Sequence, residues 1–99
     1  MSLSETQKRH LKKLAHSLKP VVMVGQHGVS EGVLAETDIA LRDHELIKMR
    51  VSAGDRDERD DMIARIVAHS GAELVQRIGN VAILFRANPD KKRPMELPS

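Results

Sequence analysis

Residues 21–30 read Val-Val-Met-Val-Gly-Gln-His-Gly-Val-Ser, and this stretch carries the clearest signals for secondary structure. Its four apolar residues, three of them β-branched, predict a short strand. The two glycines that follow predict a tight loop, because glycine lets the backbone turn without a Cβ atom in the way. Ser30 can then cap a helix, with Glu31 in its first turn. A strand, a loop and a helix in this order indicate an α/β fold.

A first helix is expected before this stretch. Ser4 and Gln7 have capping-box spacing, and Pro20 requires the helix to end before it. One stripe at helical spacing is apolar and is expected to face the core, formed by Leu11, Leu14, Ala15 and Leu18. At about 100° per residue, a group of basic side chains falls on the opposite side: Lys8, Arg9, Lys12, Lys13 and His16. The helix therefore predicts a basic surface.

The remaining elements follow from periodicity and turn signals. Apolar residues at 47, 49 and 51 alternate with Lys48 and Arg50, which predicts a strand with one buried face. A third helix begins in the acidic segment 55–61 and ends at Gly71. Strands at 74–78 and 81–85 are joined by Gly79-Asn80, a two-residue hairpin turn. The predicted order is α-β-α-β-α-β-β, with the first three strands parallel and a mixed four-stranded sheet.

Length and composition indicate one small domain. The chain has 99 residues and no cysteine, and we expect a single domain over 1–87 followed by a mobile basic tail over 88–99. The absence of cysteine fits a reducing compartment. The longest apolar run, residues 21–24, is far shorter than the ~20 residues of a membrane span. A cytoplasmic monomer with no membrane association is expected.

Charge is distributed unevenly along the chain. The net formal charge is +2, but residues 1–30 carry +4, residues 31–62 carry −5 and residues 63–99 carry +3. A local basic field attracts a polyanion even when the net charge is small. The alternative is that these charges are only solvated surface, and charge alone does not decide between the two.

The loop Gly25-Gln26-His27-Gly28 is the most informative motif. Two glycines allow the backbone to approach a phosphate, and the following helix start favours anions. A glycine-x-x-glycine loop is also how KH modules hold a nucleic-acid backbone. His27, at the tip, can donate to phosphate or stack on a base, although simple exposure is the alternative. The loop lacks the lysine and hydroxyl of a nucleotide-hydrolysing P-loop.

Other kinds of site are not indicated. No two of the five histidines have the i, i+4 spacing of a helical zinc pair, and no motif indicates a nucleophile and a base that converge on one site. The acidic segment 55–61 is explained by its place at a helix start better than by a cation. We therefore expect no catalytic residue, metal, cofactor or small-molecule substrate. Phe85 is the only aromatic residue and is expected in the core, which favours recognition of RNA backbone and shape over base stacking.

Residues Leu11 to Arg86 resemble the CRM domain, the chloroplast RNA splicing and ribosome maturation family, and most closely its single-domain bacterial YhbY-type members. The resemblance rests on residues 14–22, 25–34, 44–48 and 78–80 in combination. It implies a fold like the C-terminal domain of translation initiation factor 3 with an extra N-terminal helix. It also implies binding, without catalysis, to rRNA of the large ribosomal subunit or its pre-50S particle. Gln26 and Ser30 stand where members often carry lysine and threonine.

The leading hypothesis is an RNA-binding ribosome assembly factor that holds structured rRNA. The expected RNA contacts come from the loop, the helix cap and the basic helix: Gly25, Gln26, His27, Gly28, Ser30, Lys8, Arg9, Lys12, Lys13, His16 and Lys19. The alternative is a protein-interaction module that uses the acidic segment 55–61 on a basic ribosomal protein.

Overall fold

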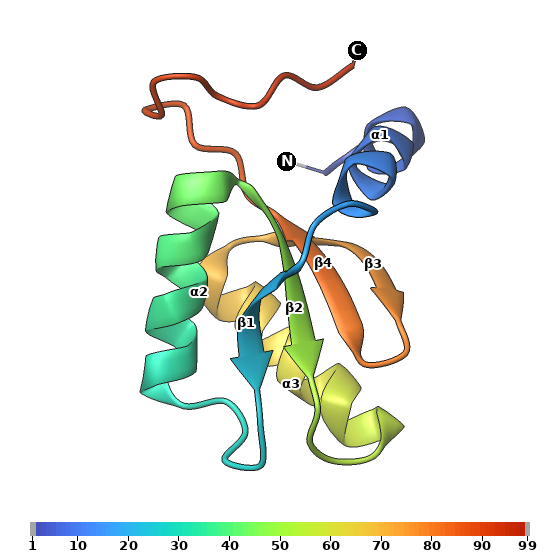
Figure 1. Cartoon of the computed structure of the whole chain (residues 1–99), viewed down its shortest axis with the longest axis vertical. Helices are drawn as coiled ribbons and strands as arrows, with labels where there is room; N and C mark the ends of the chain where they lie inside the picture. Colours follow the sequence, from blue (N-terminus) through green and yellow to red (C-terminus); the bar gives the residue numbers. More distant parts are fainter. Residues whose placement is uncertain (1, 99) are drawn as a thin grey trace.

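The computed structural model describes residues 2–98 (Figure 1). Its elements have the predicted order: α1 (Glu5–Ala15), β1 (Pro20–Val24), α2 (Glu31–His44), β2 (Leu46–Val51), α3 (Arg56–Ser70), β3 (Glu73–Ile78) and β4 (Val81–Phe85). The α/β fold class is therefore confirmed. Within residues 2–98, no helix has the length and apolar character needed to cross a membrane.

The sheet is mixed and has four strands in the order β1-β2-β4-β3. β1 pairs with β2 in parallel, and β4 pairs in antiparallel with both β2 and β3. The first three strands thus point in the same direction, as predicted. The sequence did not predict that β4 lies between β2 and β3. This order arises because the chain leaves β2 through α3, passes over one strand position, and returns through the hairpin to fill it.

One face of the sheet is covered by α2 and α3 (Figure 1). The alternating residues of β2 that were predicted to be buried, Ile47, Met49 and Val51, all point to this side and are at most 1% exposed. They pack against Leu41 of α2 and Ile66 of α3 in one continuous apolar cluster. Its other buried members are Val22, Val24, Ile63, Ala72, Ala82 and Leu84. This closed core holds the domain together.

The other face is covered at one end only. Leu11 and Ala15 of α1 are fully buried there, against a second cluster formed with Leu46, Val75, Ile83 and Phe85. The expectation that Phe85 lies in the core is confirmed. The remainder of this face has no helix over it, so part of the sheet stays accessible (Figure 1).

The helix caps agree with the sequence signals. Ser4 and Gln7 form the predicted capping box of α1, and Gly71 ends α3 with a left-handed φ of 73°. The extent of the buried stripe on α1 was predicted wrongly. Leu14 and Leu18 remain 39% and 37% exposed and line an open hollow beside the sheet: Leu18 lies beyond the last helical residue, Ala15, and Leu14 lies to one side of the buried Leu11 and Ala15.

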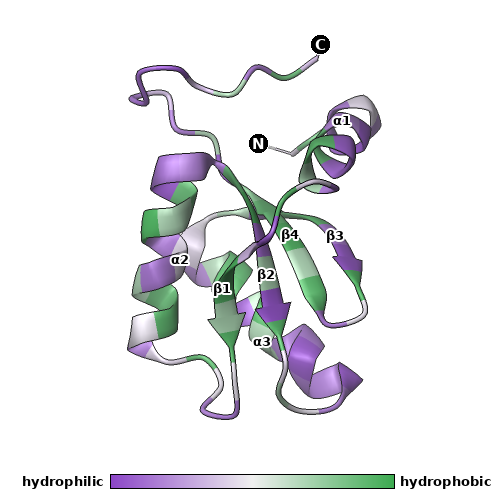
Figure 2. Cartoon of the chain, viewed as in Figure 1, coloured by the Kyte–Doolittle hydropathy of each residue, from purple (hydrophilic) through white to green (hydrophobic). Residues whose placement is uncertain are grey.

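The C-terminal segment makes more contacts than its composition suggests. Met95 and Leu97 pack against the second cluster, and the carboxylate of buried Glu45 accepts hydrogen bonds from the backbone N–H groups of Asn88 (2.8 Å) and Met95 (2.7 Å). These contacts attach the described part of the segment to the domain, although the segment is mostly hydrophilic (Figure 2). Its mobility stays a prediction.

Candidate nucleic-acid interface

The loop between β1 and α2 is a tight turn. The N–H of Gly28 donates to the carbonyl of Gly25 at 2.9 Å, and Gly28 has a φ of 68°. This left-handed conformation favours glycine, because an L side chain costs roughly 1–2 kcal/mol there. Gln26 and His27 form the exposed tip of the turn. The backbone geometry therefore presents these two side chains to solvent, as the sequence predicted.

Gly25 and Gly28 differ in why a glycine stands at each position. Gly28 is required by its φ, although a Cβ there would meet only Met62, at an ordinary 3.9 Å. Gly25 has no such φ, and a Cβ built on it would have no neighbour within 4 Å. Packing within the described chain therefore does not explain the glycine at position 25. A bare backbone at an exposed site suits close approach by another molecule.

Ser30 caps α2 as predicted. Its hydroxyl oxygen accepts a hydrogen bond from the N–H of Val33 at 3.2 Å, and its carbonyl accepts from Leu34. The hydroxyl proton remains able to donate to an anion beside the loop. The helix start, with the positive end of its dipole, follows the turn directly. Gly25, Gln26, His27, Gly28 and Ser30 are thus brought together.

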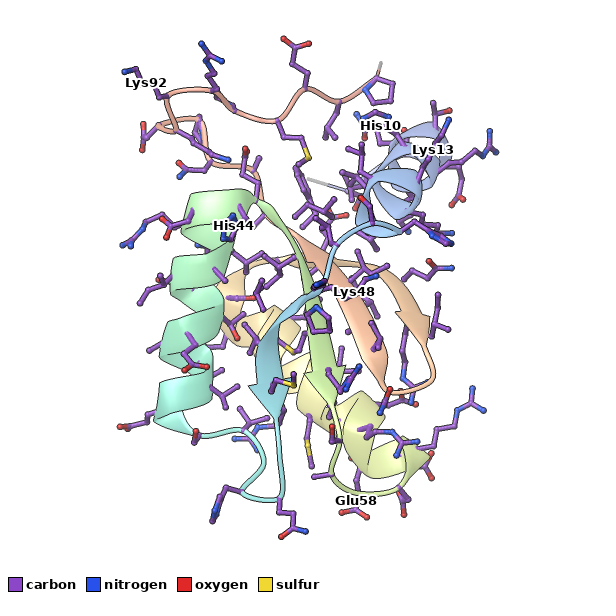
Figure 3. The ribbon with its side chains drawn as sticks, in the orientation of Figure 1. His10, Lys13, His44, Lys48, Glu58 and Lys92 are labelled. Carbon is purple, nitrogen blue, oxygen red and sulfur yellow. The ribbon has the colours of Figure 1, made fainter. Side chains whose placement is uncertain are left out.

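The basic residues of α1 flank its buried stripe and do not all lie opposite to it. Lys8 and Lys12 are half-buried, whereas Arg9, Lys13 and His16 are exposed. The predicted placement was wrong in this respect, because only Leu11 and Ala15 define the buried direction once Leu14 and Leu18 are excluded. Figure 3 shows Lys13 on the outer side of the helix. The basic surface therefore extends from the outside of α1 to its junction with the sheet.

The loop and the basic helix are far apart. α1 precedes β1 and the loop follows it, so they lie beyond opposite ends of that strand (Figure 1). At about 3.3 Å per residue, a five-residue strand spans roughly 16 Å. The two parts of the predicted site are therefore not one pocket. They can act together only on a ligand long enough to reach both.

Two basic residues that were not among the predicted site residues lie between these parts. Lys48 is in register with Pro20 and Arg50 with Met23, so they follow β1 from its start towards the loop. Both side chains lie on the side of the sheet that α1 covers, where they share a hollow with Lys12, His16 and Lys19. Figure 3 shows Lys48 near the middle of the molecule. The alternation of Lys48 and Arg50 with Ile47 and Met49 places the two basic residues on the opposite face of the sheet. In the sequence this alternation was used only to predict the buried face.

The two sides of the molecule carry opposite charge. The helices α2 and α3 together hold eight acidic residues against four basic ones. On the other side, α1 holds Glu5 against four basic residues, and Lys19, Lys48 and Arg50 add to it. The small net charge therefore conceals one mainly acidic and one mainly basic side, and the basic side includes Lys48 and Arg50 from the acidic block 31–62. A polyanion is attracted to the α1 side.

The acidic segment 55–61 has structural roles. Asp55 caps α3: its carboxylate accepts a hydrogen bond from the N–H of Glu58 at 2.9 Å. The carboxylate of Glu58 accepts in turn from the N–H of Asp55, which completes a capping box. Asp60 pairs with Arg77 of β3 at 2.6 Å. Three of its five carboxylates are therefore engaged in holding α3 and the sheet. Within residues 2–98, no three His, Asp or Glu side chains gather closely enough to hold a metal ion.

Arg86, just after β4, ties the two covering helices together. Its guanidinium donates to a carboxylate oxygen of Asp38 at 2.6 Å and to the carbonyl of Ser70 at 2.9 Å. The hydrogen bond and positive charge of Arg86 lower the pKa of Asp38 from its ordinary value of 3.8. These contacts belong to the acidic side and lie away from the basic surface.

The chain is similar to known proteins both in sequence and in fold. The chain is 46% identical over 97 residues to an RNA-binding protein of Haemophilus influenzae, covering 98% of this chain and 96% of the relative. It is 45% identical over 89 residues to a probable RNA-binding protein of Pseudomonas aeruginosa, covering 90% and 86%. A hypothetical protein of Staphylococcus aureus, solved in solution, superposes with a TM-score of 0.81 at 31% identity, over 98% of this chain and all of that one.

The match also extends to a family model. Residues 3–86 match the model of the CRS1 / YhbY (CRM) domain, which spans every helix and strand of the structure. The resemblance seen in the motifs of the sequence is thereby confirmed. The chain belongs to the CRS1 / YhbY (CRM) domain family.

Proposed function

We propose that this protein binds structured rRNA of the large ribosomal subunit precursor and acts, without catalysis, as a cytoplasmic ribosome assembly factor. RNA binding is supported by the names of its relatives and by the basic side of the domain. The observation that carries the proposal is the row of basic residues that runs from α1 towards the loop, formed by Lys12, Lys48 and Arg50. Such a row fits the backbone of a folded RNA.

Each part has a distinct role in this proposal. The loop holds one phosphate at its bare backbone, with Gln26 and His27 beside it and Ser30 donating from the helix start. The helix α1 holds further phosphates through Lys8, Arg9, Lys12 and Lys13, with His16 and Lys19 at its C-terminal end. The protein acts as a monomer, and the RNA backbone bridges the roughly 16 Å between the two parts.

The test is equilibrium binding to a structured large-subunit rRNA fragment over a salt series. With about five to seven phosphates engaged, log K is expected to fall against log salt with a slope of about −4 to −6. Gly25→Asp is the sharpest variant, because its Cβ enters open space and its carboxylate repels phosphate. We expect it to weaken binding about tenfold or more while the fold is kept. Ala64→Asp, exposed on α3, is the matched control and should bind like the native chain.

Two results would contradict the proposal. A salt-independent affinity would exclude phosphate contacts as its basis. Equal binding by Gly25→Asp and the native chain would mean that the loop is only a turn. Gly28→Asp is a useful second variant, but its φ of 68° adds backbone strain, so its folding must be verified first.

The alternative, a protein-interaction module that uses residues 55–61, makes a separate prediction. Asp57 and Asp61 are the exposed carboxylates of this segment outside the capping box and the Arg77 pair. If the alternative holds, Asp57→Asn with Asp61→Asn abolishes binding to a basic ribosomal protein, and loop variants do not. RNA binding that survives these two changes favours the RNA proposal.

A further inference from the structure

A hollow of about 350 Å³ opens on the uncovered part of the sheet, between the end of α1 and strands β2, β3 and β4. Its apolar lining includes Ile78, Val81 and Ile83. Its basic lining includes Lys12, Lys48 and Arg50. This volume is within the range of roughly 300–1,000 Å³ that small ligands occupy in proteins. The hollow therefore combines an apolar surface with a basic border.

The apolar part of this hollow is accessible in the folded chain. Ile78, at the end of β3, is 59% exposed, and its cross-strand partner Val81 on β4 is half-buried. A single exposed isoleucine is ordinary on a protein surface, but Ile78 shares this hollow with Val81 and Leu18, and an apolar patch with a polar border marks an interaction site. No part of residues 2–98 covers this one.

The charge of the lining residues limits which kind of molecule can occupy the hollow. None of the residues that line the hollow is acidic, whereas five carry a basic or imidazole group. The occupant must therefore offer a negative charge next to an apolar surface. A nucleotide does so, since its phosphates are anionic and the faces of its base are apolar. In duplex RNA the bases are stacked inside, so only an unpaired nucleotide can turn its base towards a protein.

The polar lining also fits a base. His16 and Arg50 supply planar groups, and both imidazole and guanidinium planes stack on bases in RNA complexes. Gln76 brings a side-chain amide, which can both donate to and accept from the edge of a base. These groups compensate for the lack of aromatic residues on this face, since Phe85 is buried.

We propose that this hollow receives the base of one unpaired nucleotide of the bound RNA, while Lys12 and Lys48 hold the phosphates on either side of it. The inference rests on the proposed RNA binding and adds a preference that the loop and α1 alone do not give. The protein then distinguishes a continuous duplex from a helix with a bulge.

The experiment compares two RNA hairpins that share one stem, of which only one carries a single bulged nucleotide. Full-length protein is expected to bind the bulged hairpin about tenfold more tightly, near the lower end of what stacking one base contributes. Ile78→Ser changes no charge and removes the exposed apolar side chain. It should reduce this preference several-fold while binding to the plain hairpin is kept. Ile39→Ser, at a 48% exposed isoleucine on α2, is the matched control and should keep the preference.

A second measurement on the native chain does not depend on the folding of a variant. A 4-thiouridine at the bulge, activated by light, should crosslink to peptides that contain residues 12–19 or 76–83. Crosslinks confined to the loop at 25–28 would overturn the inference. Equal binding of both hairpins, or a preference that Ile78→Ser retains, would also overturn it and leave the proposed function intact. If neither hairpin binds, the proposed function fails together with the inference.

Discussion

The two faces of the sheet differ both in cover and in charge. One face lies under α2 and α3, where side chains such as Leu84 and Ile66 are completely buried and the outer surface is mainly acidic. The other face lies under α1 and the C-terminal segment at one end only, and its open part is bordered by Lys48 and Arg50. The closed face stabilises the fold, and we propose that the open face binds RNA. A change on one face should therefore affect stability, and a change on the other should affect RNA affinity.

The largest effect is expected on the closed face. Leu84→Ala removes a fully buried side chain from β4 and should lower the free energy of unfolding by about 2–5 kcal/mol, because a cavity remains. Urea unfolding measures this loss. Leu74→Ala, at a 38% exposed leucine of β3, is the control and should cost much less. Because Leu74 pairs with Leu84 on the same face of the sheet, equal losses would mean that burial under α2 and α3 does not determine the cost.

The next largest effect is expected where the C-terminal segment covers one end of the open face. The carboxylate of Glu45 accepts hydrogen bonds from the backbone N–H groups of Asn88 and Met95. In Glu45→Gln, the NH₂ group of the new amide faces one of these two donors and cannot accept from it. An unpaired buried donor costs about 1–3 kcal/mol, and amide hydrogen exchange over residues 88–95 should become faster. Glu96→Gln, which is exposed, is the control. Unchanged exchange in Glu45→Gln would show that Glu45 does not hold the C-terminal segment in place.

A smaller effect, on affinity alone, distinguishes the two faces directly. Lys48→Glu with Arg50→Glu should weaken binding to structured RNA about tenfold, and the salt slope should become shallower by about two, one for each lost phosphate contact. Arg56→Glu with Arg65→Glu makes the same change of charge on α3 and should alter neither quantity. If both double variants lose affinity equally, net charge rather than the open face controls binding.

The smallest effect concerns the ion pair that joins α2 to the end of β4. Because Arg86 lowers the pKa of Asp38 in the folded state, the pair stabilises the protein above the ordinary pKa of 3.8 and this contribution disappears as the pH falls through the lowered value. The side chain of Asp38 is 60% exposed, so the contribution is below about 1 kcal/mol. The stability difference between native protein and Asp38→Asn should shrink from pH 6 towards acidic pH. A difference that grows on acidification would contradict this.

Local signals in the sequence predicted the elements well. The capping box of Ser4 and Gln7, the alternation around Met49 and the hairpin turn at Gly79-Asn80 each act over a few residues, and the structure contains all three. The insertion of β4 beside β2 could not be predicted in this way, because it depends on pairing between strands far apart in the chain. The anchoring of Met95 by Glu45 is non-local for the same reason.

The candidate site was only partly predictable. The loop was found because its residues are adjacent in the sequence. Lys48 and Arg50 were missed because their place beside α1 depends on how the helix sits over the sheet. The exposure of Leu14 and Leu18 was also missed, since helical periodicity does not reveal how wide a part of the helix the sheet covers or where the helix ends.

The most direct test of the central claim is to map the RNA contact on the protein by NMR, from backbone amide shifts during titration with a structured rRNA fragment. We expect the shifts to be confined to α1, to Lys48 and Arg50 on β2, and to the loop at 25–28, while the outer surfaces of α2 and α3 remain unchanged. Shifts centred on α2, α3 or the acidic segment 55–61 would contradict the assignment of the open face as the RNA-binding surface.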